Sequence, residues 1–207
     1  MTNTAERNIL AIKLIFITSL ILANVTAGKI LDIYGFIVPG AALCYAFTFL
    51  CTDLISEIKG KKEAHELVLL GFFCSLFASG LIFLTQLLPA ASFAQDKADA
   101  YRILLGINFR VVIASMTAYL ISQWIDVIIF HKIRKATKGR HKWLRNTAST
   151  SLSQVIDTSI FIGIAFYGVV PNIWIMVMSQ YILKVLIAII DTPFFYLLTK
   201  NIKFHEQ

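Results

Sequence analysis

The most informative residues of the sequence are amides and ionisable side chains that interrupt long apolar stretches. They are Asn24, Asp53, Gln123, Asp126, Gln154, Asp157, Gln180, Lys184 and Asp191. An ionisable group is costly to place in the hydrocarbon core of a bilayer, so such groups face a partner or a cavity. Carboxylates accept hydrogen bonds, and amides both donate and accept them. These residue types therefore predict a polar pocket for a planar, hydrogen-bonding solute.

Asp157 and Lys184 are the strongest candidates for direct contact. Asp157 lies ten residues after Thr147, and Lys184 lies eleven residues after Ile173. At 1.5 Å per residue, Asp157 lies about 15 Å and Lys184 about 16 Å from the start of its own predicted helix, and the two helices start on opposite sides of the membrane. Both positions are near the middle of a hydrocarbon core about 30 Å thick. An ion pair there offsets part of the cost of burying each charge, and Gln180 lies one turn before Lys184.

Two interpretations of these polar residues are open. In one, they pair only with each other and hold helices together in the membrane. In the other, which we favour, they line a ligand pocket, because ionisable groups inside membranes are functional by default. Aromatic side chains at Tyr119, Trp124, Phe161 and Tyr181 would then supply stacking faces.

A short pattern, Ser-Gln-x-x-Asp, occurs at residues 122–126 and again at 153–157. Residues three apart on a helix lie on one face, so the Gln and Asp of each copy point the same way. A second pattern, Asp-Thr-x-x-Phe, occurs at 157–161 and 191–195. These copies are consistent with a duplicated unit, but they are short, and chance similarity explains them at least as well.

The elements that would position these residues are long apolar helices. Of the 207 residues, 57% are hydrophobic and only 15% are charged, against about 25% charged in a soluble domain. A helix needs roughly 20 apolar residues to cross a bilayer. Six stretches qualify, at about 9–28, 36–55, 67–88, 111–130, 147–170 and 173–198. The sequence therefore predicts an all-α membrane protein with a single six-helix transmembrane domain over residues 1–207.

The basic residues are distributed unevenly between the two sides of the predicted helices. Thirteen of the 19 fall on one side: Arg7, Lys59, Lys61, Lys62, Lys132, Arg134, Lys135, Lys138, Arg140, Lys142, Arg145, Lys200 and Lys203. The excess of Lys and Arg in cytoplasmic loops predicts that both termini are cytoplasmic, in a multi-pass protein of the cell (inner) membrane. The basic block at 132–145 is expected to lie beside anionic lipid, and we predict no nucleic-acid partner.

The remaining chemistry is sparse. Cys44, Cys51 and Cys74 all fall inside predicted helices and form no CxxC pair, so we expect neither a disulfide framework nor a metal site, and no cofactor. The segment 89–110 is the longest on the other side, and it is long enough for a short helix lying on the surface.

Four stretches of the chain resemble the queuosine precursor transporter family, also called the vitamin uptake transporter family. They are residues 49–57, 115–127, 148–158 and 184–193, and they occur in the family's order. The chain departs from the family at Lys59, where many relatives carry an aromatic residue.

The resemblance implies a six-helix fold similar to the substrate-binding subunits of energy-coupling-factor transporters. It also implies import of the queuosine precursors 7-cyano-7-deazaguanine (preQ0) and 7-aminomethyl-7-deazaguanine (preQ1) for tRNA modification. Matches to family motifs support a substrate-binding set of Asn24, Gln123, Asp126, Gln154, Asp157 and Lys184, to which we add Gln180. Asp53 and Asp191 are candidates for gating or coupling.

Three hypotheses follow from these residues. The first is an importer that works alone or as a homo-oligomer, coupled to protons through Asp157 or Asp126. The second is a substrate-binding subunit that needs a separate energising module, since the chain has no phosphate-binding loop. The third is an intramembrane aspartyl enzyme that uses Asp126 and Asp157. Neither Asp lies in a glycine-rich active-site motif, so we do not expect an enzyme.

Overall fold

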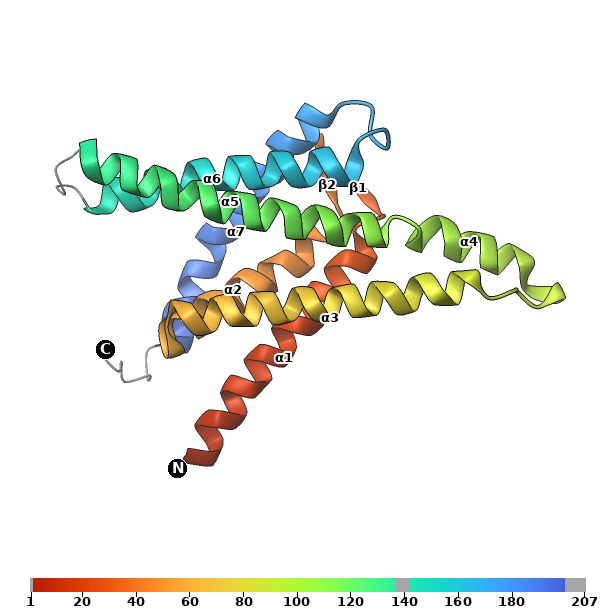
Figure 1. Ribbon diagram of the computed structural model, residues 1–207, viewed down its shortest axis with the longest axis horizontal. Coiled ribbons are helices and arrows are strands. Elements are labelled where there is room, and N and C mark those ends of the chain that lie inside the picture. The colour runs from red at the N-terminus through yellow and green to blue at the C-terminus, as the bar shows by residue number, and fades with distance from the viewer. Residues whose placement is uncertain (1, 137–141, 200–207) are drawn as a thin grey trace.

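Long helices make up most of the structure (Figure 1). The computed structural model describes residues 2–136 and 142–199. Six helices of 18 to 29 residues form the bundle: α1 (Thr2–Thr26), α2 (Ala42–Lys59), α3 (Lys61–Leu87), α5 (Asn108–Ala136), α6 (Lys142–Phe166) and α7 (Ile173–Thr199). The shorter elements are β1 (Ile30–Ile33), β2 (Phe36–Pro39), the 3-10 helix η1 (Ser92–Ala94) and α4 (Gln95–Leu105).

Helices form over parts of all six predicted apolar stretches, and several extend beyond them. The extra turns carry charged residues, as at Lys61 and Lys62 in α3, which a search for apolar runs leaves out. The segment 89–110 contains the short helix α4, as expected, and no residue of α4 itself is buried.

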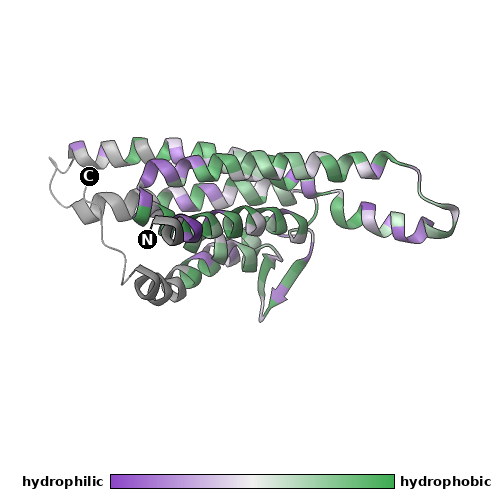
Figure 2. Cartoon of the chain, turned by 90° about the horizontal axis from the view of Figure 1, so that it is seen from below, coloured by the Kyte–Doolittle hydropathy of each residue, from purple (hydrophilic) through white to green (hydrophobic). Residues whose placement is uncertain are grey.

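The helices have the length and apolar surface of membrane spans. Within the described residues, three stretches are long and apolar enough by themselves: Glu6–Thr26, Lys61–Leu87 and Ser92–Ile125. Shorter apolar helices cover Ser151–Phe166 and Ile173–Ile187. Apolar residues extend along most of the helices (Figure 2). On α3, the exposed side chains Leu70, Phe73, Phe77 and Leu84 follow one face, which is the pattern of a surface that contacts lipid.

The predicted start of the second helix at residue 36 was wrong. Residues 30–39 instead form an antiparallel hairpin in which Ile30 lies opposite Pro39 and Ile33 lies opposite Phe36. The turn between the strands is Tyr34-Gly35, with φ of 53° and 87°. Positive φ at both central residues is typical of the two-residue turns that match the twist of a hairpin. The helix α2 begins only at Ala42, after Pro39 and Gly40.

The hairpin is closed at its base by a hydrogen bond and is attached to α7 through its second strand. The Gly40 N–H donates to the Lys29 carbonyl oxygen at 2.6 Å, and a Cβ at Gly40 would lie 2.7 Å from the Thr26 carbonyl oxygen. Only glycine therefore fits at this close approach. On α7, the Ser179 hydroxyl accepts the Ile37 N–H at 3.2 Å, and Val38 beside it is buried.

The two ends of the bundle differ in chemistry. The N-terminal end of α1, the α2–α3 turn at Gly60 and the C-terminal end of α5 lie at one end (Figure 1). We call it the basic end, because Arg7, Lys59, Lys61, Lys62 and Lys132 belong to these segments. The hairpin and the α6–α7 turn lie at the opposite end, which we call the hairpin end.

Arg110 and Asn108 close the packing at the hairpin end. The Arg110 guanidinium donates to the Ile164 carbonyl oxygen at 2.6 Å and to the Tyr167 carbonyl oxygen at 2.8 Å. The first bond satisfies a carbonyl group that the last turn of α6 leaves without a helical partner, and the second holds the turn that follows α6. A buried hydrogen bond from Ser79 to Asn108 joins α3 to the start of α5.

Candidate functional site

A cavity of about 540 Å³ lies among the six long helices, and each of them contributes to its wall. This volume is in the range of small-molecule sites, roughly 300 to 1,000 Å³. The polar residues of the wall are Tyr45, Thr48, Thr52, Asp53, Ser56, Lys61, His65, Ser115, Tyr119, Ser122, Gln123, Gln154, Asp157, Gln180 and Lys184. Apolar residues, among them Phe16, Phe49, Phe72 and Phe161, complete it.

The cavity opens toward the basic end of the bundle. Its wall reaches the α2–α3 turn at Ser56 and Lys61, and Lys61 is exposed. At the other end of the cavity, Phe161 and Gln180 are buried. The hairpin and the buried side chains around Phe166 lie beyond them. The cavity thus reaches exposed residues at the basic end and ends among buried side chains toward the hairpin end.

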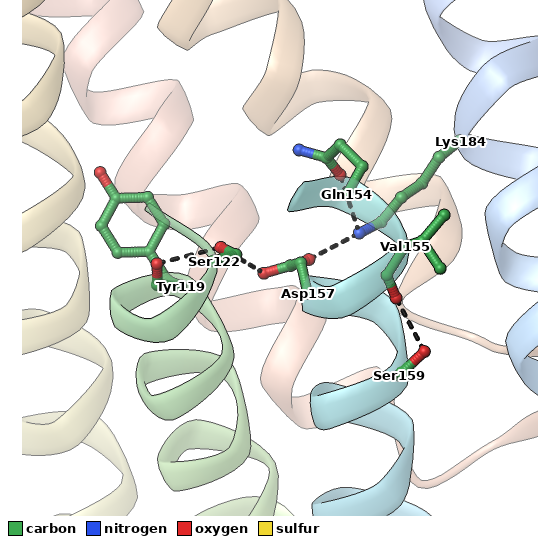
Figure 3. Close-up of polar contacts among 7 residues, drawn as sticks. All are labelled: Tyr119, Ser122, Gln154, Val155, Asp157, Ser159 and Lys184. Carbon is green, nitrogen blue, oxygen red and sulfur yellow. Dashed lines mark hydrogen bonds and ion pairs between the residues drawn. The ribbon is translucent and has the colours of Figure 1, made fainter. Parts of the chain in front are cut away.

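An ion pair between α6 and α7 forms the polar centre of the wall. Lys184 Nζ lies 2.8 Å from Asp157 Oδ2 and donates to Gln154 Oε1 at 3.3 Å (Figure 3). The two charged side chains are only 16% and 22% exposed. Gln154 and Asp157 both reach Lys184 because residues three apart share one helix face. The contact predicted between Asp157 and Lys184 is therefore confirmed.

A hydroxyl from α5 approaches the second oxygen of the carboxylate. Ser122 Oγ lies 3.4 Å from Asp157 Oδ1 and also donates to the Tyr119 carbonyl oxygen at 3.0 Å (Figure 3). The Gln154 amide nitrogen points away from Lys184 in the same view, and it has no hydrogen-bond partner among residues 2–136 and 142–199. With one carboxylate and one ammonium, the cluster is neutral, yet it still presents N–H donors and oxygen acceptors. This combination suits the uncharged, hydrogen-bonding edge of a polar ligand.

Aromatic rings line the cavity on two sides. The ring of Tyr45 packs edge-on against Phe161, with centroids 6.3 Å apart, and lies over Phe49 at the same distance. Nearer the open end, His65 stacks on Tyr119 with centroids 6.0 Å apart. His65 Nδ1 also lies 2.9 Å from the Tyr119 hydroxyl oxygen. Flat aromatic surfaces beside a neutral polar cluster are suited to a planar heterocycle.

Comparison with known proteins identifies the family. Residues 39–198 match the family model described as "Putative vitamin uptake transporter". The chain belongs to the vitamin uptake transporter family. The resemblance found in the sequence is thereby confirmed, and this family membership together with the apolar helices makes the chain a membrane protein.

Three relatives in the vitamin uptake transporter family carry more specific names. A "Probable queuosine precursor transporter" of Bacillus subtilis is 31% identical over 188 residues, which cover 89% of this chain and 82% of that protein. One of the same name from Haemophilus influenzae is 31% identical over 60% of this chain and 50% of that protein. The "Queuosine precursor transporter" of Escherichia coli is 30% identical over 77% of this chain and 71% of that protein. No solved structure matches the chain.

The cavity collects most of the residues predicted for a site. Besides the Asp157 cluster, Gln180 lines its closed end, and Gln123 and Asp53 line it nearer the open end. Asn24 is buried but does not line the cavity. The side chains of two further candidates, Asp126 and Asp191, lie outside the described residues.

Of the four aromatic residues predicted to stack on a ligand, two line the cavity and two do not. Tyr119 and Phe161 line the cavity, whereas Tyr181 does not and Trp124 is 67% exposed. His65, which the sequence did not mark as part of a site, lies in the wall.

Hydroxyl groups form a part of the cavity wall that was not predicted from the sequence. Tyr45, Thr48, Thr52 and Ser56 line the cavity from α2, and Ser115 lines it from α5. Their spacing of three and four residues places the α2 hydroxyls on one helix face. A stripe of hydroxyls within an apolar stretch would have been the pattern to search for.

Proposed function

We propose that this chain imports the deazaguanine precursors of queuosine, preQ0 and preQ1, across the cell membrane. The observation that supports this most is the polar cavity built around Asp157, Lys184 and Gln154. It has room for one small molecule, it is flanked by aromatic rings, and its charges neutralise each other. The names of three relatives suggest the same class of substrate.

The chemistry of the cavity suits a guanine-like ring. Such a ring is planar and carries N–H donors and a carbonyl acceptor along one edge. The Lys184 ammonium has three N–H donors, of which two are directed to Asp157 and Gln154. The third donor and the Gln154 amide nitrogen remain for a ligand carbonyl, and hydroxyl and carboxylate oxygens remain for its N–H groups.

The proposed orientation places the basic end in the cytoplasm, with both termini there and one six-helix domain spanning the inner membrane. The distribution of Lys and Arg supports it, since cytoplasmic loops carry the excess. In this orientation the cavity is open to the cytoplasm, as expected for a carrier at the stage of substrate release.

Binding to the purified full-length chain tests the proposal. We expect saturable binding of preQ0, and loss of that binding in Asp157→Asn, which removes the charge that holds Lys184 in place. Glu66→Gln is the matched control, because Glu66 is exposed and does not line the cavity. Equal binding by the two variants would remove the Asp157 cluster from the site, and no binding by the unchanged chain would reject the substrate class.

The means of driving transport is a separate proposal. We propose that the chain works alone, and the alternative is a binding subunit of an ATP-driven transporter with a similar six-helix fold. Purification from native membranes without crosslinking separates the two. An ATP-hydrolysing module that copurifies in fixed proportion would favour the binding subunit.

A further inference from the structure

Gln180 is the most deeply buried polar residue in the described wall of the cavity. Only 2% of the residue is exposed. Its carbonyl oxygen has no hydrogen-bond partner in the described part of the chain. An amide oxygen without a partner lowers stability, because burial removes the water that would otherwise bond to it. Its place in the cavity wall suggests that a ligand provides the missing bond.

The backbone around Gln180 is held on both sides. The preceding residue, Ser179, accepts the N–H of Ile37 from the hairpin at 3.2 Å. One helical turn later, Lys184 is held by Asp157 at 2.8 Å. The part of α7 that carries the amide is thus fixed at the closed end of the cavity before any ligand arrives, and a preorganised backbone favours binding.

Each neighbouring polar group already has at least one partner in the protein. One oxygen of Asp157 accepts from Lys184, and Ser122 approaches the other. Gln154 accepts from Lys184 through its own carbonyl oxygen. Among these residues, Gln180 alone has a buried side-chain oxygen without a partner in the described structure.

We propose that Gln180 is a specificity-determining residue and that it pairs with the lactam edge of the heterocycle, where a ring N–H stands beside a ring carbonyl. A primary amide presents an acceptor and a donor side by side, so it forms two parallel hydrogen bonds with such an edge. Rotation of the amide by half a turn exchanges its oxygen and nitrogen, so either order of donor and acceptor is matched. This inference rests on the proposed function, since it names the edge of the deazaguanine that the site recognises.

Selectivity between two ligands tests the inference. One is preQ0, and the other is 2-amino-7-cyano-7-deazapurine, which lacks the ring carbonyl and the adjacent N–H. A site built to hydrogen-bond a group rejects a ligand that lacks it, because its own polar groups are then left unpaired. We expect the purified full-length chain to bind preQ0 at least about tenfold more tightly than the analogue.

Gln180→Met keeps the length of the side chain and removes the amide. We expect it to weaken preQ0 binding while leaving the analogue nearly unchanged, so that the ratio of the two dissociation constants falls toward one. Gln180→Glu provides a second variant that keeps the acceptors but loses the donors, and it should lower the ratio as well. A merely structural role would weaken both ligands together.

Ser75→Ala is the control for a buried polar atom without a partner. Ser75 is buried in α3, its hydroxyl oxygen has no partner in the described chain, and it does not line the cavity. In Ser75→Ala, the ratio of the dissociation constants for the analogue and preQ0 should equal that of the unchanged chain. If the Gln180 variants keep that ratio, the role of Gln180 is overturned even though preQ0 binds. If the unchanged chain binds neither ligand, the proposed function fails instead.

Discussion

At the scale of single residues, the ion pair between Asp157 and Lys184 determines the chemistry of the cavity. Each charge makes the other tolerable in a wall that is largely shielded from water. The pair also holds Gln154 and Lys184 in fixed positions, with donors still available to a ligand. Removing one partner therefore has two effects, one on stability and one on binding, and suitable variants separate them.

Asp157→Asn should destabilise the protein by about 1–3 kcal/mol, because it leaves a mostly buried ammonium without its counter-charge. The double variant Asp157→Asn with Lys184→Met removes both charges and should recover most of that stability. We expect neither variant to take up preQ0. Thermal unfolding in detergent and uptake into cells measure the two properties. Normal uptake by the stable double variant would show that the pair only holds the helices together.

The same residues show what a sequence can reveal about a membrane site. Charged and amide residues in apolar stretches are conspicuous because their burial is costly, so Asp157, Lys184 and Gln154 were found in advance. Hydroxyls are not conspicuous, because they bond to their own helix. Thr48 donates to the Tyr45 carbonyl oxygen at 2.8 Å, and Thr52 to that of Thr48 at 3.0 Å. Such residues are tolerated in any apolar helix, so their presence did not mark a cavity.

At the scale of secondary-structure elements, close helix packing gives the cavity its shape. Gly71 on α3 lies against α1, where an added Cβ would approach Phe16 to 2.7 Å and Leu20 to 2.9 Å. Gly80 on the same helix has open space around it. The two glycines therefore allow the same substitution to be compared at a packed and an open position.

Gly71→Leu should destabilise the protein by about 1–3 kcal/mol, because the larger side chain forces α1 and α3 apart. Gly80→Leu should leave the unfolding temperature nearly unchanged. Thermal unfolding of both purified variants in the same detergent makes the comparison. Equal losses at the two positions would mean that α1 and α3 do not pack as described.

The hairpin shows why element boundaries were harder to predict than elements. Residues 36–39 are apolar, so they look like the beginning of the helix that follows. The dipeptide Tyr34-Gly35 and the sequence Pro39-Gly40 are both turn formers, and they would have indicated a hairpin. Its attachment to α7 through Ser179 depends on residues 142 positions apart, which no local pattern reveals.

At the scale of the whole molecule, the length and apolar character of the helices were predictable from composition alone. The order in which they surround the cavity was not, because it depends on packing between distant segments. The basic residues predict how the molecule is oriented in the membrane. The open end of the cavity coincides with the end that is rich in Lys and Arg.

The orientation in the membrane can be measured by labelling cysteines in cells. In a background with Cys44→Ala, Cys51→Ala and Cys74→Ala, we expect Tyr34→Cys at the exposed tip of the hairpin to react with an impermeant maleimide from outside. Lys61→Cys, at the open end of the cavity, should react only after the membrane is permeabilised. The reverse pattern would invert the proposed orientation.

The central claim is that the cavity carries queuosine precursors into the cell. The most direct measurement is the queuosine content of tRNA in cells that cannot make the precursor, lack their own importer and receive nanomolar preQ0 outside. We predict that the chain restores the modified base, that Glu66→Gln also restores it, and that Asp157→Asn does not although it is inserted in the membrane. An inserted, unchanged chain that restores no queuosine with either preQ0 or preQ1 would contradict the proposed substrate.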